Sequence, residues 1–533
     1  MTRVHNRTVG PRHERLAEGS NSSRWHRTSA ILMAVCVLLV AACTSGSTDN
    51  SGTPQTREPD KLATGEPMDL RVLVYNIEYG GDETTDRVIE KVGADIVGVL
   101  ESYNRLPEIA KRTGYPYYNV GLQILSKYRI LEPSGADGLY AFIEVQPGYV
   151  IPFFNTHLDY VRYGPKLLVG GTPLDEVIAS ENEVRTSSMK LLTPDMQQLA
   201  DQGYPVLLTG DFNEPSSLDY TQETVGTRPG ITEPVLWPVS ETLFDIGMRD
   251  TYREIHPDPL ETPGVTKDNP DFRKGGTGDR IDYVYAGGPV TTTDSILIGE
   301  RGGADVVRGF EPWTSDHRAV LSSFELSPVA LPTTVSLDRR ILTKGDELRV
   351  DYNAPGNGET SIAVVPEGGD ASDAIETAAT GRSGWIWFDT DSPTLKANGY
   401  DIVMLDSGGR ELARNSFWVR SKNADVAIDT GKDTYAVGEP IDVTWDDGPA
   451  NRWDWIGVYR ASASDPHEDD YLLWGYTGGH ESGALPPQVF GQMTLNEDSQ
   501  GSPWPLPPGN YRIHYLLTDK YASAGYTDIT VVE

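Results

Sequence analysis

The feature that most limits the fold is a series of short apolar runs between residues 68 and 326, with few helical segments between them. Each run has the length and composition of a strand: 70–76, 94–101, 149–157, 204–213, 279–286 and 317–326. Many strands with few intervening helices favour an α+β sandwich over a doubly wound parallel sheet. Pro152 agrees with this, because proline is poorly tolerated inside a buried parallel sheet.

Two segments of the same region have helical features. Residues 84–93 carry apolar side chains at helical spacing and end at Gly93, a frequent helix stop. Residues 179–203 hold at least one more helix, and Pro194 marks a point where it can break. We therefore expect helices that cover the strands rather than alternate with all of them.

After Pro332 the pattern changes to short alternating strands. An order of features occurs twice, because residues 343–350 correspond to 436–443 and residues 399–405 correspond to 509–515. The sequence therefore predicts two all-β sandwiches, over 331–422 and 424–533. Each has the usual size of an immunoglobulin-like module.

The N-terminal segment has the pattern of an export signal. Thirteen apolar residues, 30–42, follow Arg24 and Arg27, and this length is typical of a signal peptide and short for a membrane span. The run ends in small residues before Cys43, which resembles the lipobox of bacterial lipoproteins, where that cysteine is acylated. The pattern predicts a lipoprotein-type signal peptide over 1–43, and an uncleaved signal anchor is the alternative.

The expected location is outside the cytoplasm, anchored to the cell membrane through lipid on Cys43 or secreted. Residues 44–67 are rich in Ser, Thr, Gly and Pro and predict a flexible linker. The only cysteines are Cys36 and Cys43, so we expect no disulfide in the processed chain. The net charge of −33 repels polyanions at long range, which weighs against general nucleic-acid binding.

Polar side chains stand at the ends of many strands between residues 68 and 326. They are Asn76, Glu101, His157, Asp211, Asn213, Asp282, Asp316 and His317. Asp211 and Asn213 are two positions apart, so their side chains point to the same side of an extended chain. Glu101 and Asp316 are hard oxygen ligands, which favours Mg²⁺ or Mn²⁺ with water in the remaining positions. Such an ion completes its coordination with substrate phosphate, while His and Asn donate to the phosphoryl oxygens.

Seven motifs occur in a fixed order: VYNIEYGG (74–81), VGVLESY (97–103), ILSKYRI (124–130), FFNTHLDY (153–160), LLTGDFNEP (207–215), DRIDYVYA (279–286) and SDHRAV (315–320). In this order they resemble the endonuclease/exonuclease/phosphatase superfamily of metal-dependent phosphoesterases. The resemblance implies a catalytic domain over 68–327 with a four-layer α/β sandwich, in which two β-sheets pack together and helices lie outside.

The resemblance also implies a metal site. Glu101 corresponds to the principal ligand of Mg²⁺ or Mn²⁺, with Asp316 lining the same site and Asn76 close to it. Many members have Gln before the glutamate, whereas this chain has Leu100. That change keeps the ligand and removes a neighbouring amide.

The remaining strand-end residues correspond to catalytic groups. Asp211 matches the group that orients or deprotonates the attacking water, and Asn213 matches a phosphate donor. His317, paired with Asp282, would contact the scissile phosphate, and His157 matches a second catalytic histidine. The superfamily leaves open whether Asp211 or His317 is the base.

These features predict an exported metal-dependent phosphoesterase, first of all a phosphodiesterase or endonuclease. One alternative is a phosphoesterase for phospholipids or inositol phosphates, and another is a non-catalytic binding protein of the cell surface. The expected partners are a phosphate ester (nucleic acid, lipid or small molecule) and the membrane that holds the lipid anchor. Tyr163, Arg185 and Arg280 lie near the motifs and are candidates for substrate contact.

Overall fold

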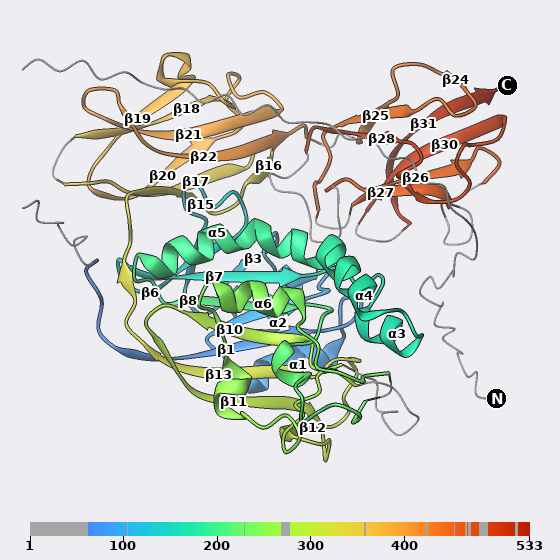
Figure 1. The fold of residues 1–533 in the computed structure, drawn as a ribbon. Coiled ribbons are helices and arrows are strands. Elements are labelled where there is room, and N and C mark those ends of the chain that lie inside the picture. Colours follow the sequence, from blue (N-terminus) through green and yellow to red (C-terminus); the bar gives the residue numbers. More distant parts are fainter. Residues whose placement is uncertain are drawn as a thin grey trace, which may run out of the picture. The chain divides into compact units, whose positions relative to one another are not determined.

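Figure 1 shows the computed structural model of the chain. The structure describes residues 62–533 except 104, 229, 268–277, 357–358, 423–424, 452–453, 464–465, 467–470, 479–488 and 518–520. The expected signal peptide, Cys43 and residues 44–61 of the expected linker lie outside the described residues. Within the described part, no helix is both long and apolar enough to cross a membrane.

The first sheet of the N-terminal region has seven strands and contains the strands predicted over 70–76, 94–101 and 317–326. The central strand is β1, which pairs in parallel with β2 and antiparallel with β13. The order across the sheet is β12 (Val306–Phe310), β11 (Val290–Glu300), β13 (Ala319–Leu326), β1 (Met68–Asn76), β2 (Ile96–Leu100), β4 (Ile124–Ser126) and β3 (Tyr117–Asn119).

The second sheet contains the strands predicted over 149–157, 204–213 and 279–286. Its order is β5 (Arg129–Leu131), β6 (Ala141–Gln146), β7 (Tyr149–His157), β8 (Val206–Asp211), β10 (Asp282–Gly287) and β9 (Arg249–Asp250), and β14 (Val329–Ala330) also pairs with β7. Strands β7 and β8 are parallel, whereas β8 and β10 are antiparallel. The mixed directions agree with the expected α+β class.

Successive side chains along each strand point alternately to a core between the two sheets and to a core under the helices. From β1, Leu70 and Val72 pack between the two sheets, whereas Leu73 packs against the helices on the outer face. In the second sheet, Phe153 faces the inner core and Phe154 faces the helices on its own outer side. The strands therefore form the two inner layers, and helices cover each outer face.

The helices of this region are α1 (Glu83–Val92), α2 (Leu106–Thr113), α3 (Gly164–Val169), α4 (Leu174–Glu181), α5 (Ser187–Asp201), α6 (Pro238–Asp245) and α7 (Thr251–Ile255), with a π-helical segment η1 (Asn182–Thr186) and a 3₁₀ turn η2 (Ser217–Asp219). The predicted helix over 84–93 is α1. Asp82 caps it through the N–H groups of Thr84 and Thr85, and Gly93 ends it in the left-handed conformation. Such an N-cap is worth about 1 kcal/mol.

The expectation that Pro194 can break the second helix is wrong. Helix α5 continues through Pro194, which lies inside its bounds. Proline removes the N–H that would reach the carbonyl of Lys190, and the hydroxyl of Thr193 lies 3.5 Å from that oxygen instead. The irregular part of this helical run is η1, which precedes α5.

The C-terminal region is all-β, as expected. Its strands are β15 (Thr334–Leu337), β16 (Ile341–Thr343), β17 (Glu347–Asn353), β18 (Thr360–Pro366), β19 (Glu376–Thr380), β20 (Ser383–Asp389), β21 (Asn398–Asp406), β22 (Glu411–Arg420), β23 (Ala427–Asp429), β24 (Thr434–Ala436), β25 (Ile441–Asp446), β26 (Trp455–Arg460), β27 (Tyr471–Tyr476), β28 (Gly491–Leu495), β29 (Gln500–Gly501), β30 (Gly509–Leu516) and β31 (Ser523–Val532), with a 3₁₀ turn η4 (Ala371–Asp373) after β18.

The sheets of this region repeat. The orders β15-β17-β20 and β16-β22-β21-β18-β19 recur as β23-β25-β28 and β24-β31-β30-β26-β27. Both copies contain one parallel pair, β16 with β22 and β24 with β31. Each copy has its own core of buried apolar side chains. The internal repeat read from the sequence is thus present in the strand order, and the immunoglobulin-like class stays a prediction.

Candidate active site

Strand register places three of the predicted residues side by side at one end of the second sheet. Asp211 ends β8, and its neighbours in register are His157 on β7 and Asp282 on β10. All three side chains are buried, and none exceeds 4% exposure. An acidic group is therefore held between a histidine and a second carboxylate.

The first sheet contributes Asn76 and Glu101 in the same way. Asn76 ends β1 and is paired in register with Leu100, the last residue of β2, so that Glu101 follows directly. The amide nitrogen of Asn76 donates to Glu101 Oε1 at 3.1 Å and to Asp211 Oδ2 at 2.9 Å. Asn76 thus joins the site residues of both sheets.

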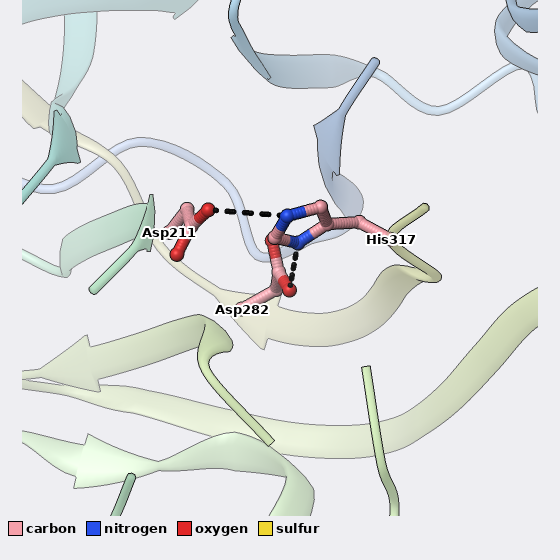
Figure 2. A group of neighbouring side chains, drawn as sticks. All are labelled: Asp211, Asp282 and His317. Carbon is pink, nitrogen blue, oxygen red and sulfur yellow. Dashed lines mark hydrogen bonds and ion pairs between the residues drawn. The ribbon is translucent and has the colours of Figure 1, made fainter. Parts of the chain in front are cut away.

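His317 lies between two carboxylates (Figure 2). Its Nδ1 is 2.9 Å from Asp282 Oδ2, and its Nε2 is 3.6 Å from Asp211 Oδ2. Burial acts to lower the pKa of His317, but the carboxylates of Asp282 and Asp211 together outweigh burial, and the pKa is raised to about 9. At neutral pH the ring is therefore a cation and a hydrogen-bond donor.

The second histidine is held by the amide that follows β8. Asn213 Nδ2 lies 3.2 Å from His157 Nε2 and donates to the carbonyl of Leu158 at 2.9 Å. The same His157 nitrogen is 3.5 Å from Asp211 Oδ2. The backbone N–H of Asn213 donates to Asp211 Oδ1 at 3.0 Å. The strand end therefore delivers Asp211 and Asn213 to one place, as their spacing predicts.

The predicted metal ligands are Glu101, Asp316 and Asn76. Glu101 is buried, and its carboxylate oxygens are hard ligands that suit Mg²⁺ or Mn²⁺. Asp316 forms an ion pair with Lys267. Asn76 directs its amide nitrogen at the carboxylates, while its oxygen accepts the N–H of Glu78. Among the described residues, the ligand atoms that cluster within 4.8 Å belong instead to Asp211, Asp282 and His317. The donor set of Glu101, Asp316 and Asn76 stays a prediction.

The backbone beyond the ends of β1, β2 and β8 is held in the left-handed region at several non-glycine residues. The φ angles are 54° at Glu78, 47° at Tyr79, 59° at Glu101 and 48° at Asn213. Side chains with a Cβ adopt this region at a cost, and such conformations concentrate at functional sites. The surrounding hydrogen bonds must therefore hold these residues in place.

Sequence reasoning missed Glu78, Lys267 and Ser315. Glu78 accepts the N–H of Asp316 at 3.0 Å, and burial together with the Asp316 carboxylate raises its pKa. Its position two residues after Asn76 was a usable signal. Ser315 donates to the carbonyl of Asn76 and accepts the N–H of His317. Lys267 precedes Asp316 by 49 residues, and nothing in the local pattern marks it.

The three candidates for substrate contact have protein partners. Tyr163 donates to Asp279 at 2.6 Å. Arg280 is 1% exposed and lies between the carboxylates of Asp219 and Asp250. Arg185 is fully buried and paired with Glu181. These contacts hold the interior together, and a role in substrate binding stays a prediction for all three.

Glu214, next to Asn213, belongs to a buried cluster with Glu181 and Arg185. Burial and the neighbouring Glu181 carboxylate raise the pKa of Glu214 well above its usual value. The folded chain therefore keeps a proton on Glu214 that the unfolded chain releases above its ordinary pKa. Stability from this proton is present at acidic pH and is lost as the pH rises through the folded-state pKa.

Glutamine is neutral at every pH. We therefore expect Glu214→Gln to raise the free energy of unfolding at pH 8 and to change it little near pH 4.5. One pKa unit corresponds to about 1.4 kcal/mol, so the gain in the free energy of unfolding at pH 8 should exceed about 1 kcal/mol. Urea unfolding at the two pH values measures it. Equal effects of the substitution at both values would show that Glu214 titrates normally.

The site lies within a part of the chain that matches a known protein family. Residues 73–317 match the model of the endonuclease/exonuclease/phosphatase family. This part of the chain belongs to that family. The matched residues begin in β1 and end at His317, and they include every strand-end residue of the site.

A relative of this domain is an uncharacterized protein of Caenorhabditis elegans. It is 28% identical over 294 residues, which cover 48% of this chain and 91% of that protein.

Three solved structures are similar to this chain. An endonuclease/exonuclease/phosphatase from Beutenbergia cavernae has 15% identity and a TM-score of 0.31, over 66% of this chain and 99% of that one. An AP endonuclease from Archaeoglobus fulgidus has 15% identity and a TM-score of 0.33, over 48% and 98%. A mannosyl-6-phosphatase from Bacteroides thetaiotaomicron has 16% identity and a TM-score of 0.29, over 48% and 99%.

Proposed function

We propose that this endonuclease/exonuclease/phosphatase domain is an active, divalent-metal-dependent phosphoesterase, and first of all a phosphodiesterase that cleaves nucleic acid. The observation that carries the proposal is Asp211, whose carboxylate lies within 3.6 Å of nitrogens from both histidines. An intact acid–base set of this kind is expected where water attacks a phosphate ester.

The residues divide the work by their contacts. Asp211 accepts hydrogen bonds from the side-chain amide of Asn76 and from the backbone N–H of Asn213. These bonds orient the carboxylate to receive a proton from water. His317, charged and fixed by Asp282, donates toward the phosphoryl oxygens as negative charge builds on them. A bound divalent ion would add positive charge at the phosphate from the side of Glu101.

The test is hydrolysis of supercoiled plasmid by the full chain with Mg²⁺ or Mn²⁺. Nicking that EDTA abolishes would support a nuclease. If the folded protein binds metal and leaves plasmid intact, the diester proposal fails, and phospholipids and inositol phosphates become the substrates to assay. A folded chain that neither binds metal nor cleaves any of these esters would contradict the enzymatic proposal and favour a binding protein.

We also propose that the protein is exported and held at the membrane by lipid on Cys43. The apolar run over 30–42 and the small residues before Cys43 support this. The expected result is that the expressed protein enters the detergent phase of a Triton X-114 extract, whereas Cys43→Ser moves it to the aqueous phase. Equal partition of both proteins would argue against the lipid anchor.

A further inference from the structure

Two tyrosines occupy equivalent positions beyond the catalytic ends of β1 and β2. These strands are parallel, and Asn76 of β1 is in register with Leu100 of β2. Tyr79 and Tyr103 each stand three residues beyond that pair. The same strand pairing that sets Asn76 beside Glu101 therefore brings the two tyrosine-bearing loops together.

The rings of these tyrosines are nearly parallel. Their centroids are 6.3 Å apart and the angle between the ring planes is 10°. Tyr79 is 44% exposed and Tyr103 is partly exposed, so solvent reaches the pair. Parallel aromatic faces at a protein surface are suited to stack on a planar ring.

The loop that carries Tyr79 is held by hydrogen bonds to Glu101 and Arg105. The N–H of Tyr79 donates to Glu101 Oε2 at 2.9 Å, and the N–H of Gly80 donates to the carbonyl of Glu101 at 2.7 Å. Arg105, from the loop after β2, donates to the carbonyl of Gly80. Both tyrosines have a positive φ, 47° at Tyr79 and 41° at Tyr103, which this bonding must maintain.

The pair is also close to the reacting groups along a short chain of hydrogen bonds. Tyr79 contacts Glu101, Glu101 accepts from Asn76, and Asn76 donates to Asp211. The backbone of Tyr79 is therefore three hydrogen bonds from Asp211, on the side of the predicted metal ligand Glu101.

We propose that Tyr79 and Tyr103 form a stacking site for the nucleobase of a nucleotide whose phosphate is bound at Asp211 and His317. The inference deepens the proposed function, because it names the group attached to the phosphate. It selects a planar ring rather than a lipid chain. Stacking does not depend on the sequence of bases, because every base presents a planar face.

The test measures binding without turnover. The probe is 2-aminopurine riboside 5′-monophosphate, whose fluorescence is quenched when the base stacks on tyrosine, with ribose 5-phosphate as the competitor that lacks a base. The full chain should quench the probe and bind it about tenfold more tightly than ribose 5-phosphate. Tyr79→Ala and Tyr103→Ala should each reduce this preference to about twofold.

Two further variants separate stacking from loss of structure. Tyr79→Phe keeps the ring and should keep the preference. Tyr526→Ala removes a tyrosine that is 55% exposed on β31 and should also change nothing. An unchanged preference in Tyr79→Ala with a native circular dichroism spectrum would overturn the inference. Equal binding of ribose 5-phosphate and the nucleotide to the wild type would do the same and point to a sugar phosphate.

Failure of the stacking site and failure of the enzymatic proposal give different results. If plasmid is cleaved and the probe shows no base preference, only the stacking site is wrong. If the probe binds with the expected preference and no ester is hydrolysed, the stacking site stands and the enzymatic proposal is wrong.

Discussion

Replacing His317 with alanine should lower kcat about a thousandfold and leave the fold intact, because a positioned acid–base group contributes about 10²- to 10⁴-fold. The ring lies between Asp282 and Asp211 and is 4% exposed, so it is both preorganised and shielded from water. Steady-state hydrolysis of the substrate identified by the plasmid and lipid assays measures the effect. Native circular dichroism confirms that the variant is folded.

A matched control is available in His256→Ala. His256 lies outside the site, with Nε2 2.8 Å from the carbonyl of Ser295. This variant should keep wild-type kcat. If His317→Ala keeps wild-type rates, the assignment of His317 to the site is wrong, and so is the role given to Asp282.

The pH profile of the wild type separates the two candidates for the base. Since the pKa of His317 is raised to about 9, the ring is protonated below that pH. If His317 donates and Asp211 takes the proton from water, kcat should fall as the pH rises through about 9. A rate that increases up to that pH would instead make neutral His317 the base.

The strand ends were predictable from the sequence because their signal is local. An apolar run followed by Asp211 and Asn213 needs only the period of two to place both side chains on one side. The repeat of the two all-β units was predictable for the same reason, since corresponding strands carry corresponding patterns. Tyr79 and Tyr103 were not found, because their equivalence depends on the register of β1 with β2.

The buried charges could not be assigned from the sequence. Arginine is usually exposed, and only the fold reveals that carboxylates on distant segments enclose Arg280. Arg185 pairs with Glu181 four residues earlier, and only the fold shows that this pair is buried. Lys267 is similar, because its partner Asp316 follows after a long connection. Partners that are far apart in the chain leave no periodic pattern, so sequence reasoning gives their charge and not their environment.

Two candidate sets of metal ligands predict different effects of substitutions on metal affinity. The ion-binding group that clusters in space is Asp211, Asp282 and His317. However, His317 Nδ1 is hydrogen-bonded to Asp282, and its Nε2 faces the carboxylate of Asp211 at 3.6 Å. A ring that donates at both nitrogens offers no lone pair to a metal ion. The buried carboxylate of Glu101 has no such conflict.

Glu101→Ala should therefore raise the dissociation constant for Mn²⁺ by at least about a hundredfold, because even residues that only support ligands cost about 10- to 100-fold. Isothermal titration of Mn²⁺ measures this without turnover. Asp282→Asn is the comparison, since it keeps the shape of the side chain and should weaken Mn²⁺ binding much less than Glu101→Ala does. The opposite pattern, with Asp282→Asn losing the metal and Glu101→Ala retaining it, would place the ion among Asp211, Asp282 and His317. His317 would then be a ligand rather than a proton donor, and the acid–base role would pass to His157, which faces the same oxygen of Asp211.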